Sequence, residues 1–249
     1  MKNDLNGRIS IVTGGTRGIG RDISKILAEN GSLVTAVYGN NDKEAQSLLN
    51  EIGKERLTIV KADLSSYNEC KKAVDLVVSK FGRVDVLVNN AAICPFRDIF
   101  DIDPEVWNRT WETNVSGPFF MSQLAGRYMK ESGGSIINIG SIGIFLGSET
   151  QVHYNATKGA LFSMTRSLAV AFGKYNIRVN CLAVGGIATD INKDQYTEEY
   201  LDWLIKKLPL HKMGTPEDIG EIVAFLASEK ASWITGALIP VDGGRLVAP

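Results

Sequence analysis

The chain has 249 residues, of which 44% are hydrophobic, a length that suits one α/β domain as well as two smaller ones. The 27 basic and 28 acidic side chains give a formal net charge of -1 without a long run of either sign, so a nucleic-acid or acidic-membrane surface gains no support. No apolar segment reaches the ~18 residues that span a bilayer, and we expect a soluble, cytoplasmic protein that acts on a small molecule.

Short β-branched runs alternate with longer helical patterns, which is typical of a parallel sheet. The predicted strands are 9–13, 33–38, 57–61, 84–88, 135–139, 177–182 and 237–241. Apolar residues at spacings of three and four predict helices at 18–30, 42–53, 67–81, 104–131, 152–173 and 216–228. Right-handed crossovers then give a Rossmann-type, doubly wound sheet of about seven strands with helices on both faces.

One long segment, 184–215, interrupts this alternation after the sixth predicted strand and contains a predicted short helix at 198–207. Long excursions at the carboxyl end of a parallel strand are where such sheets bind ligands. We therefore interpret 184–215 as a substrate lid on a single dinucleotide-binding and catalytic domain that spans 1–249.

The cysteines Cys70, Cys94 and Cys181 lie far apart, and His153 and His211 are the histidines of the chain. Their spacing matches no metal-ligand or redox motif, so we expect no metal site. An odd, dispersed set of cysteines fits a reducing compartment.

The segment TGGTRGIG at 13–20, here called the phosphate loop, joins the first predicted strand to the first predicted helix. Glycines permit a tight turn and close approach of the backbone, while a helix N-terminus offers free amides and partial positive charge to a pyrophosphate. A glycine cluster alone would be weak evidence, but the strand, turn and helix context is the one that this motif requires. The loop predicts dinucleotide binding.

Tyr154 and Lys158 lie four residues apart, so within a helix they share one face. An ammonium beside a phenol favours the phenolate and lowers a pKa that starts near ~10, which prepares a tyrosine for proton transfer near neutral pH. By itself this spacing fits a packed tyrosine beside a solvated lysine equally well.

Together these features resemble the short-chain dehydrogenase/reductase family, whose glycine pattern is T-G-x-x-x-G-x-G, over nearly the full length of the chain. Further matching positions are Asp63, Asn89-Asn90-Ala91-Ala92, Asn114, Ser141, Thr189, Thr235-Gly236 and Val241-Asp242-Gly243-Gly244. The family commonly has Gly where this chain has Ala92, which adds strain if the position requires a positive φ.

The resemblance implies a catalytic tetrad of Asn114, Ser141, Tyr154 and Lys158. Tyr154 would be the acid or base, and Lys158 would promote its ionisation and hold ribose hydroxyls. Ser141 would donate a hydrogen bond to the developing alkoxide, and Asn114 would hold a water that links Lys158 to solvent.

The resemblance also implies a set of cofactor-binding residues: Gly14, Thr16, Arg17, Gly18, Ile19, Gly20, Asn40, Asp63, Leu64, Asn90, Ala91, Tyr154, Lys158, Gly185, Ile187 and Thr189. Asp63 would accept a hydrogen bond from the adenine amino group. Near Gly185 the family often reads P-G-x-I-x-T, and Val184 replaces the proline, which removes a fixed φ.

The second predicted strand ends without the carboxylate that NAD-binding folds place about 20 residues beyond the glycines. The nearest acid, Asp42, is better explained as part of a helix start. Arg17 can pair with a 2′-phosphate, so we predict NADP as the preferred cofactor and NAD as the alternative. Relatives that use NAD can also carry this arginine.

The loop at 93–96, His153 and the lid segment at 188–193 resemble the corresponding parts of aldose 1-dehydrogenases, including those that act on L-rhamnose. Candidate substrate residues are Cys94, Ser141, His153, Tyr154 and Asn192. Polar side chains suit a polyhydroxylated ring, because a site that hydrogen-bonds hydroxyls rejects analogues that lack them. Lid residues such as Asn192 could equally be solvated.

Two other functions stay open. A 3-oxoacyl-acyl-carrier-protein reductase looks similar over the same length and would present a basic patch to its acidic carrier, for which Lys193, Lys206, Lys207 and Lys212 are candidates. A cofactor-sensing regulator without turnover is the remote alternative, against which the intact tetrad argues. By resemblance, the helices at 104–131 and 152–173 pair across subunits of a homotetramer, although their apolar stripes fit burial against the sheet equally well.

Overall fold

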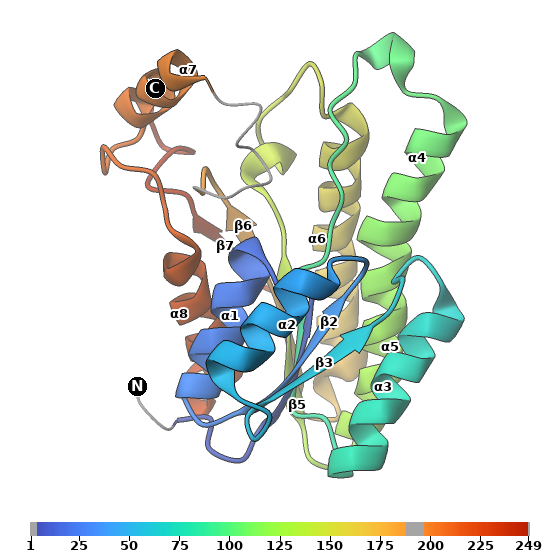
Figure 1. Cartoon of the computed structure of the whole chain (residues 1–249). Helices are drawn as coiled ribbons and strands as arrows, with labels where there is room; N and C mark the ends of the chain where they lie inside the picture. The colour runs from blue at the N-terminus through green and yellow to red at the C-terminus, as the bar shows by residue number, and fades with distance from the viewer. Residues whose placement is uncertain (1–3, 188–196, 249) are drawn as a thin grey trace.

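The computed structural model describes residues 4–187 and 197–248, in which seven parallel strands form one sheet (Figure 1). The strands are β1 (Ile9–Thr13), β2 (Leu33–Tyr38), β3 (Leu57–Lys61), β4 (Val86–Asn89), β5 (Gly134–Ile139), β6 (Ile177–Val184) and β7 (Leu238–Val241). Their order is β3-β2-β1-β4-β5-β6-β7, so successive crossovers run outward from the centre in both directions. The doubly wound sheet is confirmed, and each predicted strand end lies within two residues of the observed one.

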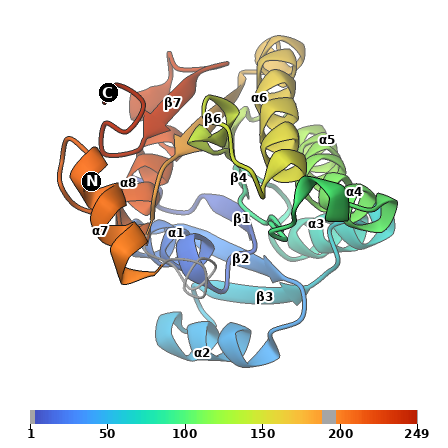
Figure 2. The same ribbon diagram turned by 90° about the horizontal axis from the view of Figure 1, so that it is seen from above.

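Helices cover both faces of the sheet (Figure 2). They are α1 (Gly18–Glu29), α2 (Asp42–Ile52), α3 (Tyr67–Phe81), α4 (Pro104–Trp111), α5 (Gly117–Met129), α6 (Val152–Gly173), α7 (Glu198–Lys207) and α8 (Pro216–Ala227). α1, α2 and α8 pack on one face, and α3, α5 and α6 pack on the other. No helix in the described part of the chain is long and apolar enough to cross a membrane.

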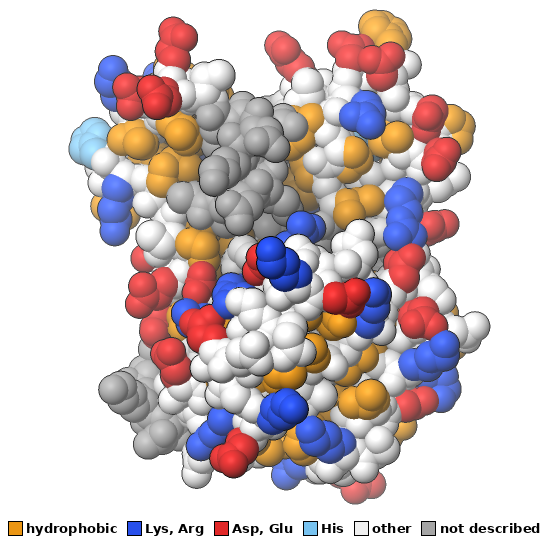
Figure 3. Space-filling model, in the orientation of Figure 1, with side chains coloured by type: hydrophobic (Ala, Val, Ile, Leu, Met, Phe, Trp, Pro, Cys, Tyr) orange, Lys and Arg blue, Asp and Glu red, His pale blue; other side chains and the backbone are white. Residues whose placement is uncertain are grey.

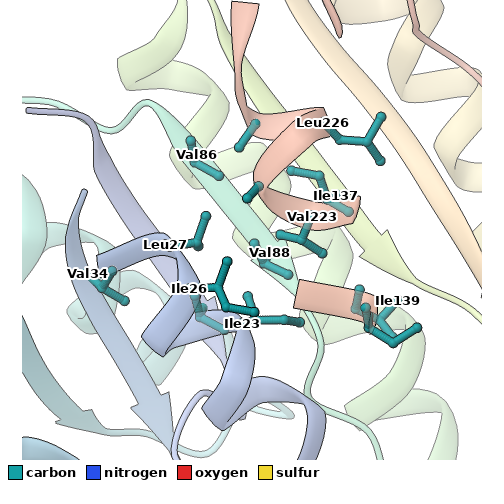
Figure 4. Close-up of a cluster of buried hydrophobic side chains, with 14 of the residues drawn as sticks. Ile23, Ile26, Leu27, Val34, Val86, Val88, Ile137, Ile139, Val223 and Leu226 are labelled. Carbon is teal, nitrogen blue, oxygen red and sulfur yellow. The ribbon is translucent and has the colours of Figure 1, made fainter. Parts of the chain in front are cut away.

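Alternation along each strand divides the core into two layers, because successive side chains point to opposite faces. In β4, Val86 and Val88 join the layer under α1 and α8, whereas Leu87 joins the layer under α3 and α5. Figure 4 shows side chains of α1 and α8 converging on the first of these layers. The rigid strands thus carry their loops to one common edge, where the phosphate loop and the predicted tetrad lie.

The helix predicted at 104–131 is interrupted by a π-helical turn at Glu112–Ser116, between α4 and α5. The local sequence explains the wide turn. Pro118 has no N–H to donate to the carbonyl of Asn114, four residues earlier. Gly117 lies so close to the loop after β3 that an added Cβ would lie 2.7 Å from the carbonyl oxygen of Leu64. Such turns occur frequently at functional sites, and this one carries Asn114.

Two predictions about loops have different outcomes. The non-glycine residues with positive φ in the described chain are Asn176 and His211, so the strain considered for Ala92 is absent. The helix predicted within the lid is confirmed as α7. Residues 188–196 of the lid lie outside the described residues, and the lid itself stays a prediction.

Candidate active site

The backbone of the phosphate loop has a conformation that requires glycine at several positions. Gly14 and Gly18 have φ values of +61° and +50°, which favour glycine. A Cβ on Gly20 would lie 2.1 Å from the carbonyl oxygen of Gly14 and 2.5 Å from Nδ2 of Asn90. Arg17 occupies the N-cap of α1, but its side chain does not cap the helix. The first-turn amides of α1 can therefore bind a phosphate, so the loop fits the pyrophosphate of a dinucleotide.

The end of β4 is tied to this loop through Asn90. Its Nδ2 donates to the carbonyls of Thr13, at 2.9 Å, and of Gly14, at 3.2 Å. Thr13 Oγ1 accepts from the backbone amides of Asn90 and Ala91 at 2.9 and 3.1 Å. Asn89 points into the core instead, where its Nδ2 donates to Asn138 Oδ1 at 2.8 Å. The two asparagines thus fix adjacent parts of the same sheet edge.

Three of the predicted catalytic side chains lie just after β5 and in the first two turns of α6. Ser141 follows β5, and its Oγ accepts from the backbone amide of Gly143 at 3.0 Å. Tyr154 lies in the first turn of α6, and Lys158 lies one turn later, with its Nζ 5.5 Å from the centroid of the Tyr154 ring. The predicted shared helix face is therefore present, and all three residues line one cleft.

Lys158 is only 3% exposed, and its Nζ donates to the carbonyl of Ile139 at 2.7 Å. Burial lowers the pKa of Lys158 from 10.5 to about 8, while the thiols of Cys181 and Cys94 act weakly in the opposite direction. The Lys158 side chain is therefore mainly protonated at neutral pH, but its pKa lies close to that pH.

Asn114 is fully buried in the π-helical turn. Its side chain exchanges two hydrogen bonds with the backbone of Ile93, both at 2.9 Å, and its Nδ2 also lies 3.2 Å from Thr157 Oγ1. Asn114 thus connects the loop after β4 to α6.

A cleft of about 700 Å³ runs from the phosphate loop to Tyr154. The predicted cofactor residues that line it are Gly14, Thr16, Arg17, Gly18, Ile19, Gly20, Asn40, Asp63, Leu64, Asn90, Ala91, Tyr154, Lys158 and Gly185. Ile187 instead lines a neighbouring cavity of about 250 Å³, together with Leu208, Met213 and Val241. Thr189 lies outside the described residues.

Among the residues that line this cleft but were not predicted from the sequence are Arg109 of α4 and Thr113 of the π-helical turn. Arg109 Nη2 donates to Asp63 Oδ2 at 3.0 Å across 46 positions of sequence. Partial burial opposes ionisation of Asp63, but hydrogen bonds from Ser65 and Arg109 outweigh it and lower the pKa of this carboxyl. The four-residue spacing of Arg109 and Thr113, on the helix that leads to Asn114, could have indicated a shared wall.

The predicted substrate residues lie in different surroundings. Cys94 is partly buried, and its Sγ accepts from Gln151 Nε2 at 3.2 Å. His153 is 0% exposed and does not line the cleft, which corrects the expectation that it contacts substrate. Burial lowers the pKa of His153, and the Pro95 carbonyl opposes this effect. Its full burial, next to a partly exposed Tyr154 in the sequence, explains the error. Asn192 lies outside the described residues.

Comparison with known families and sequences gives matches over nearly the whole chain. Residues 14–245 match the family model described as enoyl-(acyl carrier protein) reductase. An L-rhamnose 1-dehydrogenase (NAD(P)+) of Azotobacter vinelandii is 41% identical over 95% of this chain and 96% of its own. A second one, from Sphingomonas sp. (strain SKA58), is 39% identical over 98% of each chain. A 3-oxoacyl-[acyl-carrier-protein] reductase of Chlamydia pneumoniae is 36% identical over 98% of this chain and 99% of its own.

Solved structures with the same arrangement are also similar to this chain. A short-chain dehydrogenase/reductase from Serratia marcescens has a TM-score of 0.91 at 33% identity, covering 97% of this chain and 99% of that one. A blue fluorescent protein from a metagenomic library, solved in complex with NADPH, has a TM-score of 0.91 at 36% identity with the same coverage.

Proposed function

Because the chain belongs to the short-chain dehydrogenase/reductase family, we propose that it is an NAD(P)-dependent dehydrogenase that oxidises an aldose at C1, with an L-rhamnose-like sugar as substrate. The observation that carries the proposal is the position of Ser141, Tyr154 and Lys158 in one cleft with the phosphate loop. L-rhamnose 1-dehydrogenases at 39 and 41% identity supply the substrate class.

The chain offers a group for each part of the dinucleotide. The first-turn amides of α1 would bind the pyrophosphate, and Asp63 would accept from the adenine amino group. Lys158 would hold the ribose hydroxyls of the nicotinamide half. When bound, the oxidised cofactor accepts a hydride from the substrate carbon.

Tyr154 would act as the base in sugar oxidation. It would take the proton of the anomeric hydroxyl as the hydrogen on C1 is transferred as hydride, so the hemiacetal carbon would become the carbonyl of a lactone. The ammonium of Lys158 lies 5.5 Å from the ring centroid and favours the phenolate by charge attraction. Ser141 would donate a hydrogen bond to the same oxygen and orient it toward the phenolate.

Asn114 would bind the proposed water through its main-chain carbonyl rather than through its side chain. Its side-chain amide is committed to Ile93 and Thr157, so we assign the proposed water contact to its main-chain carbonyl, for which Pro118 supplies no helical donor. Such a water would give the buried Lys158 a route for proton exchange with solvent.

NADP is the proposed preferred cofactor, with NAD as the alternative. Arg17 is exposed at the cleft, forms no ion pair with the described residues and could pair with a 2′-phosphate, and Asn40 lines the same end. Asp42 is directed elsewhere, because Lys61 Nζ donates to both of its carboxylate oxygens at 3.0 Å. No carboxylate among the described residues at the end of β2 therefore opposes the 2′-phosphate.

Reduction of a 3-oxoacyl thioester on an acyl carrier protein is the second candidate, supported by the relative from Chlamydia pneumoniae. An acidic carrier would need a basic surface. Lys206 and Lys207 are exposed on α7, but Glu198, Glu199 and Asp202 lie on the same helix. Figure 3 shows acidic and basic side chains together over α7. Because α7 offers mixed charge rather than a basic patch for an acidic carrier, we favour sugar oxidation over reduction of a carrier-bound thioester.

For the organisation of the protein, we propose a single domain over 1–249 with a lid at 184–215, a cytoplasmic location and a homotetramer. Free thiols at Cys70, Cys94 and Cys181 suit a reducing compartment. The exposed side chains of Phe119 and Val170, on α5 and α6, would supply apolar surface for subunit pairing.

A panel of substrates tests this function directly. Absorbance at 340 nm is followed with NADP+ or NAD+ and a series of aldoses, and with NADPH and an acetoacetyl thioester. Turnover of sugars alone supports the proposal, and thioester reduction alone replaces it with the second candidate. Binding of NADPH without any turnover would indicate a cofactor-sensing regulator. Light scattering on the same sample tests the assembly, which a monomer at micromolar concentration would contradict.

A further inference from the structure

A small polar network lies at the end of the cleft remote from Tyr154, where the loop after β3 meets α4. Both oxygens of Asp63 are engaged: Oδ1 accepts from the backbone amide and hydroxyl of Ser65 at 3.0 and 2.9 Å, and Oδ2 accepts from Arg109 at 3.0 Å. Arg109 also donates to the hydroxyl of Ser65. The three side chains thus close a ring that fixes the plane of the carboxylate.

The ring lies at the surface of the cleft, where its contribution to folding is small. The side chains of Asp63 and Arg109 are 52% and 48% exposed, and ion pairs of such exposure contribute little stability. Ordering an exposed aspartate does matter for recognition, because a carboxylate oxygen has a second lone pair that a ligand donor can use. The network lowers the pKa of Asp63, so this acceptor stays ionised.

A second polar side chain, Thr113, lies in the same wall of the cleft. Thr113 lies one turn after Arg109, lines the cleft and is 9% exposed. Its Oγ1 has no hydrogen-bond partner among the described residues. Buried hydroxyls are normally paired, so Thr113 leaves an unpaired polar group in the wall of the cleft that Arg109 also lines.

We propose that Arg109 is a positioning residue for recognition of the adenine base, acting through Asp63. This inference rests on the proposed dinucleotide binding and adds a determinant of base specificity to it. Arg109 and Ser65 hold the Asp63 carboxylate so that it accepts from the exocyclic amino group of adenine. Hypoxanthine carries a carbonyl oxygen at that position, which a fixed carboxylate repels.

The test compares equilibrium binding of NADPH and of its hypoxanthine counterpart to the full-length protein by fluorescence titration. The variants are R109Q, R109K, D63N and the double variant D63N/R109Q, with R127Q on the exposed surface of α5 as the matched control. We expect the adenine preference of the wild type to fall roughly tenfold in R109Q, the scale of one charge-assisted hydrogen bond. R109K should recover part of it, because lysine keeps the charge but not the fork that reaches both Asp63 and Ser65.

The double variant separates positioning from direct contact. If Arg109 acts through Asp63, D63N/R109Q has the same base preference as D63N alone. In steady-state assays the change should appear in the KM for the cofactor rather than in kcat. An unchanged preference in R109Q, or equal weakening of both cofactors, would overturn this inference while leaving the proposed function standing. Failure of the folded wild type to bind NADPH would instead refute the proposed function.

Discussion

Replacing the buried Lys158 with methionine should remove catalysis without destabilising the protein at neutral pH. Burial moves the pKa of Lys158 from 10.5 to about 8. At ~1.36 kcal/mol per pKa unit, holding this ammonium charged in the folded state costs roughly 3 kcal/mol. Methionine relieves that cost but leaves the carbonyl of Ile139 without its donor, which costs about 1 to 3 kcal/mol. We therefore expect Lys158→Met to be as stable as the wild type at pH 7, or up to about 2 kcal/mol more stable.

The same change gives a pH dependence with a defined sign. Since the pKa of Lys158 is lower in the folded state, the unfolded chain binds more protons between about pH 8 and 10.5, and wild-type stability rises with pH across that window. Methionine lacks this titration. From pH 7 to pH 10, the wild type should therefore gain roughly 2.5 kcal/mol relative to the variant.

Urea unfolding of both proteins without cofactor, followed by circular dichroism at one protein concentration, measures this difference. Comparing the two proteins at each pH cancels the titration of groups that Lys158 does not influence. A Lys158→Met variant that is at least 3 kcal/mol less stable at pH 7, or a stability difference that does not change with pH, would refute the reasoning.

Two further predictions concern the phosphate loop. Arg17→Ala should lower kcat/KM for NADP+ about tenfold and leave that for NAD+ nearly unchanged, because only the 2′-phosphate loses a charged partner. Steady-state assays with both cofactors measure the ratio, and a wild type that strongly prefers NAD+ would refute the cofactor assignment. Gly20→Ala would place a Cβ 2.1 Å from the Gly14 carbonyl oxygen, so we expect a loss of about 1 to 3 kcal/mol in stability and at least tenfold weaker NADPH binding. Thermal unfolding and fluorescence titration test this, with Gly147→Ala as control, where an added Cβ meets nothing within 4 Å; equal effects of both changes would contradict it.

The features that sequence patterns could predict are those with a local physical cause. Alternation in β4 and the three-and-four spacing in α1 and α8 determine which side chains can be buried, so the sheet and its layers follow. The spacing of Tyr154 and Lys158 likewise predicts their shared helix face. The π-helical turn also has a local cause, the missing N–H of Pro118, but a periodicity of three and four residues does not detect it.

Local sequence patterns do not predict contacts between residues that are far apart in the chain. Arg109 meets Asp63 only because the crossover after β4 returns α4 to the loop after β3, and no local pattern specifies that approach. His153 was expected to contact substrate because it precedes Tyr154, yet adjacent helical residues point about 100° apart, and this imidazole is fully buried. Ala92 has no strain, because the loop after β4 does not require positive φ there.

The central claim is that Tyr154 removes the proton of the anomeric hydroxyl of an aldose, while the hydrogen on C1 would be transferred as hydride to the cofactor. The most direct test is the initial rate of absorbance change at 340 nm with L-rhamnose and NADP+, for the wild type and Tyr154→Phe, with NADPH binding by each measured in parallel. We predict sugar-dependent NADPH formation by the wild type, and a kcat at least ~100-fold lower in the variant with cofactor binding largely intact. A wild type inactive on every aldose, or a phenylalanine variant that keeps its kcat, would contradict the account.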